Sequence, residues 1–481
     1  MNRHFLPLFV TLLLIATQPA CNPDDDVQGD VGIAEQDGGD AYQGFADTGD
    51  DDTSDGDADS GDGDAGAGDS GDEDAGDGES EVDPLACPPL PETSGNTEVV
   101  VSPDDISELP HMIRTAEENT TFLLEDGTYN LTQTLHIRAD GLQLRSLSND
   151  PERVILDGRY EVNSLLLVNS SDVTVAHITL TRAVHHPIHI SPGGDDPTDL
   201  TGSHIYDVRI IDASQQFIKV NPNGARTAFV DDGRLECSYF ELTDEGRPHV
   251  DRSATGCYTG GIDAHGARGW VIRNNEFRDI YCAGEGLAEH AVHFWTGSRD
   301  TVVEKNLIVN CARGIGFGLR ESGDARTYDD DPYPEVDGLI GHYDGLIRNN
   351  IIYADHQWYD TGIELAQSRG VRAHHNTIYT PEASGSFSSI DYRFENTVAE
   401  IRNNLTDRIS RRNDAEGTVE YNLESIGPDL FVDAANLDFR LLETATDAID
   451  QGVEVDDAGL DFTGQARPRG DAPDIGAHEY Q

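Results

Sequence analysis

Apolar and polar residues alternate in short segments that recur between about Ser164 and Asn404. Four of the copies read GIDAHGARGWVIRNNEF (261–277), AVHFWTGSRDTVVEKNLI (291–308), TGIELAQSRGVRAHHNTI (361–378) and SIDYRFENTVAEIRNNL (389–405). The first apolar residue precedes the closing asparagine by 13 or 14 residues in the pairs Ile262 with Asn275, Val292 with Asn306, Ile363 with Asn376, and Ile390 with Asn404. Recurring units of this kind are typical of a solenoid, in which equivalent residues stack about 4.8 Å apart.

The constant spacing sets a register for the first strand of each unit, in which successive side chains point to opposite faces. We expect one set to face the core: Ile188, Ile218, Ile262, Val292, Ile315, Ile363 and Ile390. The residue after each of these should face solvent and form a first ladder of His189, Lys219, Asp263, His293, Gly316, Glu364 and Asp391. Two residues further on is a second ladder of Ser191, Asn221, His265, Trp295, Gly318, Ala366 and Arg393.

The ends of the chain differ from these repeats. Residues 1–20 combine Arg3, an apolar run and small residues, which predicts a secretory signal peptide. Cys21 follows directly and resembles the acylation site of a bacterial lipoprotein. Residues 21–86 are then interpreted as a disordered acidic tether, 87–430 as the solenoid and 431–481 as an associated C-terminal segment. We therefore expect an exported protein, at the cell surface, on the outer membrane or in the periplasm, held to the membrane only by a lipid.

Charge narrows the choice of partners. Residues 22–83 hold 24 acidic side chains and no Lys or Arg, so they repel one another and favour an extended tether over a calcium-binding repeat. Without these the net charge of −59 is still −35, and a surface this acidic argues against binding nucleic acid. We expect a monomer whose partner is a polysaccharide.

Six cysteines suggest disulfides in an oxidising compartment. Cys237 and Cys257 bracket a polar insertion, which predicts a bridge between them, and Cys282 and Cys311 follow equivalent positions of neighbouring coils and could also pair. Cys87 is left over. Zinc is the rival interpretation, but the chain contains no Cys-x-x-Cys.

The coils and stacked asparagines, with the opening segment TFLLEDGTYNLTQTLHIRADGLQLRSLSNDPERVILDG (121–158), resemble the pectate-lyase superfamily. The ending DFTGQARPRGDAPDIGAHEY (461–480) is similar to the terminal motif of bacterial proteins of this type. The resemblance covers roughly Val99 to Tyr480. It implies an all-β, right-handed parallel β-helix, and the asparagine line extends backward through His177, Asp207 and Ser238. The superfamily includes lyases, hydrolases, epimerases and adhesins, so fold alone does not choose among activities.

For lyases of the superfamily, the resemblance implies a proton acceptor and a cation site on the first sheet, because the C5 proton of a uronic acid becomes acidic only when its carboxylate is neutralised. Lys219, Asp263 and His293 occupy consecutive ladder positions. Lys219 or His293 is the expected base, and Asp263 is expected to orient it or to hold Ca²⁺. The triplet His185, His186 and His189 is an alternative set of metal ligands, although its context fits a strand edge better.

Residues around these three are expected to contact the polymer: His265, Trp295, Asn221, Glu289, Arg320 and Glu364. Trp295 offers a platform on which a sugar ring stacks. Insertions at 192–202, 243–260 and 321–342 should form the walls of a groove. The sequence thus favours a polysaccharide lyase, with a non-catalytic carbohydrate-binding adhesin as the alternative from another class. A hydrolase is less favoured because Asp263 and Glu364 are too far apart to act together.

Overall fold

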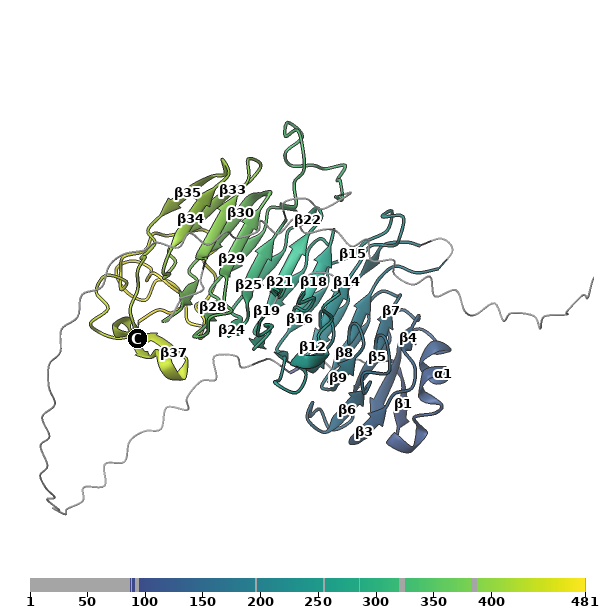
Figure 1. Ribbon diagram of the computed structural model, residues 1–481. Coiled ribbons are helices and arrows are strands. Elements are labelled where there is room, and N and C mark those ends of the chain that lie inside the picture. Colours follow the sequence, from purple (N-terminus) through teal and green to yellow (C-terminus); the bar gives the residue numbers. More distant parts are fainter. Residues whose placement is uncertain are drawn as a thin grey trace, which may run out of the picture. The chain divides into compact units, whose positions relative to one another are not determined.

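The computed structural model describes residues 87, 89–90, 95–194, 197–253, 256–284, 286–319, 325–381 and 387–480. The described part is a parallel β-helix built from three long sheets, with a small number of helical turns (Figure 1). The expected signal peptide (1–20), Cys21, the tether (21–86) and Arg320 lie outside the described residues. No helix within the described ranges is long and apolar enough to cross a membrane.

Each turn of the helix adds one strand to each sheet in the order sheet 1, sheet 2, sheet 3. In the described residues sheet 1 consists of β4 (Leu135–Ile137), β7 (Leu166–Val168), β10 (Ile188–Ile190), β14 (Ile218–Val220), β18 (Ile262–His265), β21 (His290–Trp295), β25 (Arg313–Phe317), β29 (Thr361–Ala366), β32 (Ser388–Arg393) and β34 (Ile409–Arg412). Sheet 3 consists of β3 (Gly127–Asn130), β6 (Val154–Asp157), β9 (Thr179–Ala183), β13 (Arg209–Ala213), β17 (Tyr239–Glu241), β20 (Glu276–Arg278), β24 (Leu307–Val309), β28 (Ile351–Tyr353) and β31 (Thr377–Tyr379).

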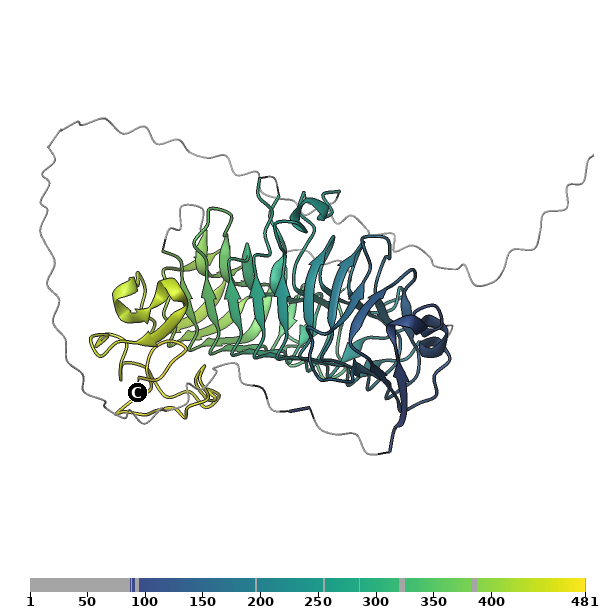
Figure 2. The ribbon, with the colours of Figure 1, turned by 90° about the horizontal axis from the view of Figure 1, so that it is seen from below.

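The coils stack side by side along the solenoid (Figure 2), and in each coil sheet 2 follows sheet 1 and precedes sheet 3. Its described strands are β1 (Thr97–Val101), β2 (Thr120–Leu124), β5 (Gln143–Ser146), β8 (Thr174–Ala176), β12 (His204–Tyr206), β16 (Arg234–Glu236), β19 (Val271–Arg273), β22 (Ser298–Arg299), β23 (Val302–Glu304), β26 (His342–Tyr343), β27 (Leu346–Arg348), β30 (Ser368–His374), β33 (Val398–Arg402) and β35 (Glu416–Glu420). Two short pairs lie outside these sheets: β11 (Leu200–Thr201) with β15 (Val230–Asp231), and β36 (Phe431–Asp433) with β37 (Asp438–Leu441).

The core lies between the three sheets and confirms the predicted inward set. All seven residues of that set, from Ile188 to Ile390, are fully buried. Aromatic rings also stack from coil to coil inside the helix, as where Phe240 lies 4.6 Å from Phe277 between ring centroids. Burying one such side chain per coil contributes roughly 2 kcal/mol, repeated along the solenoid.

A line of buried asparagines stabilises the bend between sheets 2 and 3, as predicted. The amide nitrogen of Asn306 donates to Asn350 Oδ1 at 2.9 Å, that of Asn350 to Asn376 at 3.0 Å, and that of Asn376 to Asn404 at 3.0 Å. Each asparagine also donates to backbone carbonyls, as Asn350 does to Val303 at 2.9 Å. Buried amides satisfied in this way fix the bend of every coil.

The backward extension of this line is right for Ser238 and wrong by one residue before it. The backbone N–H of Ser238 donates to Asn275 Oδ1 at 2.9 Å, so Asn275 is its next neighbour in the line. The Ser238 hydroxyl accepts a bond from the backbone N–H of Val208 at 3.1 Å, and Val208 therefore holds the preceding position. Asp207 and His177 have positive φ angles of 46° and 56°, so they belong to the left-handed turn just before the line. Their side chains pair outside it at 2.7 Å.

One end of the core and part of the outer face of sheet 3 are covered. The short helix α1 (Leu109–Arg114) buries Leu109 and Ile113 at the N-terminal end of the described helix. On the outer face of sheet 3, Phe431 and Phe439 pack on Tyr353 and Tyr379, which project outward from that sheet. The C-terminal segment thus protects a part of sheet 3 that would otherwise expose aromatic rings.

The disulfide prediction is wrong in its pairing. The structure joins Cys87 to Cys237 and Cys257 to Cys282, and it leaves Cys311 as a buried free thiol whose pKa burial raises to about 12. Cys237 lies at the bend between sheets 2 and 3, whereas Cys257 lies in a connection from sheet 3 to sheet 1. The two therefore occupy different corners of the coil. Cys282 and Cys311 both lie at the Cys257 corner, where only one of them can pair with it. Two disulfides indicate an oxidising compartment.

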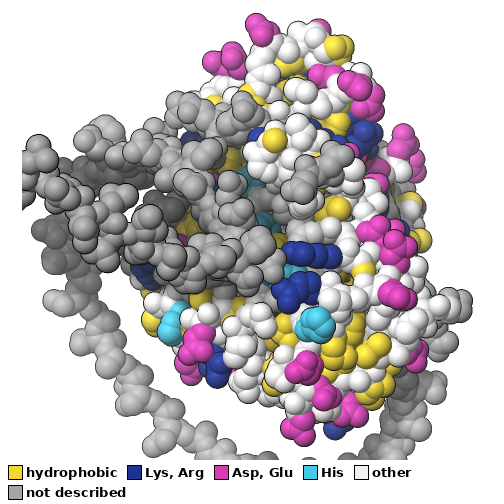
Figure 3. Space-filling view, turned by 90° about the vertical axis from the view of Figure 1, so that its right-hand side faces the viewer, with side chains coloured by type: hydrophobic (Ala, Val, Ile, Leu, Met, Phe, Trp, Pro, Cys, Tyr) yellow, Lys and Arg dark blue, Asp and Glu magenta, His cyan; other side chains and the backbone are white. Residues whose placement is uncertain are grey.

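Charge on the outside of the helix is organised in local pairs. On sheet 2, the Glu236 carboxylate accepts bonds from His204 at 2.8 Å and Arg273 at 2.5 Å. Burial opposes its charge, yet these two partners lower the pKa of Glu236 to about 2. Figure 3 views the end that carries α1 and shows acidic side chains scattered over the visible face.

Candidate functional site

The first ladder has the register that the sequence predicts. Asp263 on β18 pairs with Lys219 on β14 and with His293 on β21, and the series continues through Gly316, Glu364 and Asp391. Alternation places the whole series on the outer face of sheet 1, since the residues before each member are in the core. The ionisable side chains of Lys219, Asp263 and His293 therefore come together on three adjacent strands.

Exposure of the ladder differs from the prediction. The side chains of Lys219, Asp263 and His293 are only 8, 6 and 2 % exposed. Trp295 and Tyr258 enclose them, because the Trp295 indole contacts Asp263 and the Tyr258 hydroxyl lies 3.4 Å from Lys219 Nζ. Strand alternation assigns a face to a side chain, but it does not show which neighbours cover that face.

Lys219 and Asp263 form a buried ion pair. Lys219 Nζ donates to Asp263 Oδ2 at 2.5 Å. Burial opposes both charges, but the Asp263 carboxylate outweighs it and raises the pKa of Lys219, and Lys219 in turn holds the pKa of Asp263 well below its usual range. Lys219 is therefore a fixed positive charge near neutral pH, which favours a role in binding an anion over the role of base.

Both carboxylate oxygens of Asp263 contact nitrogen groups. Its Oδ1 accepts from Trp295 Nε1 at 2.6 Å, and its Oδ2 lies 3.3 Å from His265 Nε2 in addition to Lys219. His293 Nδ1 is 3.7 Å from Oδ1. Ca²⁺ takes six to eight oxygen ligands, so this surrounding of nitrogens does not fit the expected calcium site.

His265 is the accessible imidazole of the group, with its side chain 15 % exposed. Burial and the charge of Lys219 lower the pKa of His265 to about 4, although Asp263 acts in the opposite direction. The ring is therefore neutral at pH 7. With Nε2 directed at the carboxylate of Asp263, Nδ1 is the nitrogen that can accept a proton.

The side chains of His293 and Trp295 are more deeply buried than that of His265. Their rings are stacked, 5.3 Å apart at an angle of 3°, and Trp295 is 9 % exposed. His293 Nε2 bonds to the carbonyl of Gly318 at 3.2 Å. The predicted sugar platform at Trp295 is thus largely covered, and its indole positions Asp263 instead.

His290 and Tyr258 are two members of the site that sequence reasoning missed. Strict alternation would place His290 on the core side with Val292. The start of β21 departs from alternation, and the His290 ring lies over Gly316, where an added Cβ would be 2.7 Å from it. The glycine in the ladder was the available signal, because it makes room for a neighbouring ring.

Other predicted contact residues lie apart from this group or are paired in different ways. Glu364 is bonded by Arg393 and lies 3.6 Å from His290, and Arg393 above all holds its pKa well below the usual range despite burial. Asn221 lies 3.3 Å from His189 Nε2, two strands from His293. Among the alternative metal ligands, Nδ1 of the buried His186 is hydrogen-bonded to the Gln216 carbonyl, so this nitrogen is not available to bind a metal.

The insertions bring side chains to different faces. Tyr258, from the 243–260 insertion, reaches the ladder, whereas Arg326, from the 321–342 insertion, bonds to Asp231 at 2.6 Å beside sheet 2. A hollow with a volume of about 660 Å³ lies outside sheet 3, where Tyr160 and Asp212 line it. The described insertions thus enclose the ladder at one side and do not form one continuous groove.

Solved structures with the same architecture include three that suit comparison. A pectate lyase, Pel9A, has a TM-score of 0.50 at 13 % identity over 80 % of this chain and 98 % of its own. An alginate lyase from Paenibacillus sp. str. FPU-7 has a TM-score of 0.36 at 12 % identity, covering 68 and 99 %. The Streptococcus pneumoniae surface protein and adhesin PfbA has a TM-score of 0.42 at 13 % identity, covering 67 and 97 %.

The likeness to the pectate lyase identifies the fold: the chain is a right-handed parallel β-helix, as the sequence predicts. No family model matches the chain, and no curated protein does. At 13 % identity the likeness extends to the fold alone.

Proposed function

We propose that this protein acts on a uronate-containing polysaccharide by β-elimination at the outer face of sheet 1. The observation that carries the proposal is the group formed by Lys219, Asp263, His265 and Tyr258. The Lys219 cation and the neutral His265 imidazole both contact the Asp263 carboxylate, and the protonated Tyr258 hydroxyl contacts Lys219. The fold shared with a pectate lyase supports it.

Each residue has a distinct role in this proposal. Lys219 neutralises the substrate carboxylate with a donor that it does not give to Asp263 or Tyr258, since an ammonium carries three. His265 removes the C5 proton, and those electrons form the C4–C5 double bond as the bond from C4 to the leaving oxygen breaks. Burial raises the pKa of Tyr258, so its hydroxyl stays protonated and can give its proton to the leaving oxygen.

Asp263 positions both the cation and the base. One of its oxygens contacts Lys219 and His265 together, while the other is fixed by Trp295.

The proposal extends to the location of the protein, which is exported and held at the cell surface or outer membrane through a lipid on Cys21. The two disulfides support export, because such bonds persist in oxidising compartments.

The test is incubation of the purified protein with a panel of uronate and neutral polysaccharides while the ultraviolet absorbance of the unsaturated product is followed. We expect product from a uronate polymer, and a loss of kcat of about a hundredfold or more in His265→Gln, the scale of losing a general base. His249→Gln is the matched control, because His249 is an exposed histidine that stacks on Tyr160 beside sheet 3. Turnover that survives His265→Gln overturns the assignment of the base.

The second candidate is a carbohydrate-binding module without turnover. The low exposure of Lys219 and Asp263 favours it, since a polymer would have to reach charges that other side chains cover. It predicts binding to a polysaccharide with no product from any polymer, and equal affinity in wild type and His265→Gln. Affinity electrophoresis of both proteins in gels containing each polymer separates the two candidates.

A further inference from the structure

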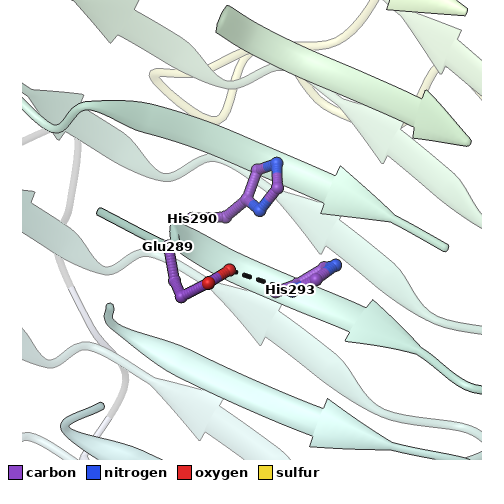
Figure 4. A group of neighbouring side chains, drawn as sticks. All are labelled: Glu289, His290 and His293. Atoms are coloured by element: carbon purple, nitrogen blue, oxygen red, sulfur yellow. Dashed lines mark ion pairs between the residues drawn. The ribbon is translucent and has the colours of Figure 1, made fainter. Parts of the chain in front are cut away.

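A second cluster lies beside this group, at the start of β21. The ligand atoms of Glu289, His290 and His293 lie within 4.8 Å of one another, and all three side chains lie on the same side of the strand (Figure 4). Glu289 is directed toward His293, with Oε2 3.9 Å from Nδ1. From this geometry we infer a binding site for a divalent transition-metal ion of the zinc class at Glu289, His290 and His293.

Unpartnered nitrogens are the first support for the inference. The His290 and His293 side chains are 1 and 2 % exposed. Within the described residues, Nδ1 of His290 and Nδ1 of His293 have no hydrogen-bond partner, and Nε2 of His290 has only the Glu364 carboxylate at 3.6 Å, beyond hydrogen-bond distance. Leaving a buried polar atom unpaired costs about 1–3 kcal/mol, so three such atoms in one place point to a ligand.

The tautomer of His293 is the second support. The Gly318 carbonyl only accepts, so Nε2 of His293 must carry the proton of that 3.2 Å bond. Nδ1 faces Glu289 Oε2 at 3.9 Å and Asp263 Oδ1 at 3.7 Å. A positive charge at Nδ1, whether a proton or a metal ion, balances these two carboxylates, and a backbone bond to the far nitrogen is the usual support of a metal-binding histidine.

Space at the cluster is the third support. Donor atoms bound to one zinc-class ion at about 2.0–2.2 Å are roughly 3.4 Å apart in a tetrahedron. The recorded 3.9 Å between Glu289 and His293 needs only a small side-chain rotation to reach this distance. Gly316 supplies the room for His290, whose ring would collide with any side chain there. Two imidazoles and one carboxylate suit zinc, iron, manganese or cobalt, and not calcium.

Among the described residues, Arg313 is a cation that competes for this cluster. Its guanidinium lies 3.7 Å from Glu289 and 3.8 Å from Glu364. Both distances are too long for hydrogen bonds, and Arg313 Nε is committed to the Ala288 carbonyl at 3.0 Å. Arg313 thus balances charge around the cluster without occupying the positions between the two imidazoles.

The test is calorimetric titration of protein freed of metal by chelation and dialysis, with Zn²⁺ and, in a parallel cell, Ca²⁺. We expect one equivalent of Zn²⁺ to bind, Ca²⁺ to fail to compete, and His290→Gln and His293→Gln each to weaken Zn²⁺ binding by about a hundredfold or more. His265→Gln is the matched control, a neighbouring histidine on the same face that lies outside the cluster, and should bind Zn²⁺ as the wild type does.

A second readout does not depend on a histidine variant that folds poorly. Co²⁺ bound by two imidazoles and a carboxylate in a tetrahedral site gives a visible absorption band, which Glu289→Gln, an isosteric change of a half-buried side chain, should abolish. Absence of stoichiometric Zn²⁺ binding by the wild type overturns the inference. So does binding that Glu289→Gln, His290→Gln and His293→Gln all leave unchanged. Neither result bears on His265 and turnover, so the two proposals fail separately.

Discussion

Replacing Lys219 by methionine removes the cation from the buried pair with Asp263 and keeps most of its apolar stem. Removing one partner of a buried ion pair costs about 3–5 kcal/mol, because the remaining charge stays without compensation. Asp263 keeps its bonds from Trp295 and His265, so we expect the lower end of this range, about 3 kcal/mol.

Asp263→Asn should cost more, about 5 kcal/mol, because the ammonium of Lys219 is then left with the Tyr258 hydroxyl at 3.4 Å. The double variant removes both charges, and it should therefore be less destabilised than the two single effects combined, by roughly 2–3 kcal/mol. Lys305→Met is the control. Lys305 is the only other lysine of the chain and is half-buried with no recorded ion pair within the described residues, so we expect a cost below about 1 kcal/mol.

Urea denaturation of the four variants and the wild type measures these free energies of unfolding. Circular dichroism and tryptophan fluorescence should give the same transition, since only then does a single free energy describe unfolding. Single effects that combine additively within about 0.5 kcal/mol would refute the reasoning, because they would mean that the two charges do not interact. A cost of Lys219→Met no larger than that of Lys305→Met would refute it too.

Three further predictions concern the fold and the site. The pKa of Glu236 is lowered, so its contribution to stability is present above pH 4.5 and is lost as the pH falls toward about 2. Urea titrations at several pH values measure this loss in the free energy of unfolding, and Glu236→Gln should reduce it by up to about 3 kcal/mol. Asn350→Ala should cost about 3 kcal/mol or more, because it leaves several buried groups unpaired, and the same titration at pH 7 measures it. Peptide mapping of the unreduced protein should find Cys257 linked to Cys282 and a thiol on Cys311 that reacts only after unfolding.

The pH dependence of turnover tests the state of His265. Its pKa is lowered to about 4, so the ring is in its proton-accepting form at higher pH. The groups that face it are Asp263, Lys219, Arg226 and Trp295. We expect kcat/KM to stay level from pH 8 down to about 5 and to fall as the pH approaches about 4. A fall centred near the ordinary histidine value would mean that another group is the base.

Local periodicity determined the solenoid, its core and its register. Ile262 and Val292 could be assigned to the core, and Asp263 and His293 to one face, because a strand alternates with period two and a coil repeats at a nearly constant length. The asparagine line followed for the same reason, since a buried amide at each bend recurs with the coil. At Asp207 the register slipped by one residue, because the apolar Val208 occupies the line there and the polar side chain belongs to the left-handed turn just before it, as that of His177 does.

Only the tertiary structure decided what each face residue contacts. Three cysteines share one corner of the helix. Which two of them form a disulfide depends on the path of each connecting segment, and the spacing of cysteines in the sequence does not reveal that path. His290 departs from alternation because Gly316 on the next strand leaves room for its ring. Lys219 is paired and buried instead of exposed because Asp263 and Tyr258 converge on it from a different strand and from a loop. Sequence periodicity assigns a side chain to a face, whereas its charge state and chemistry depend on neighbours that are distant along the chain.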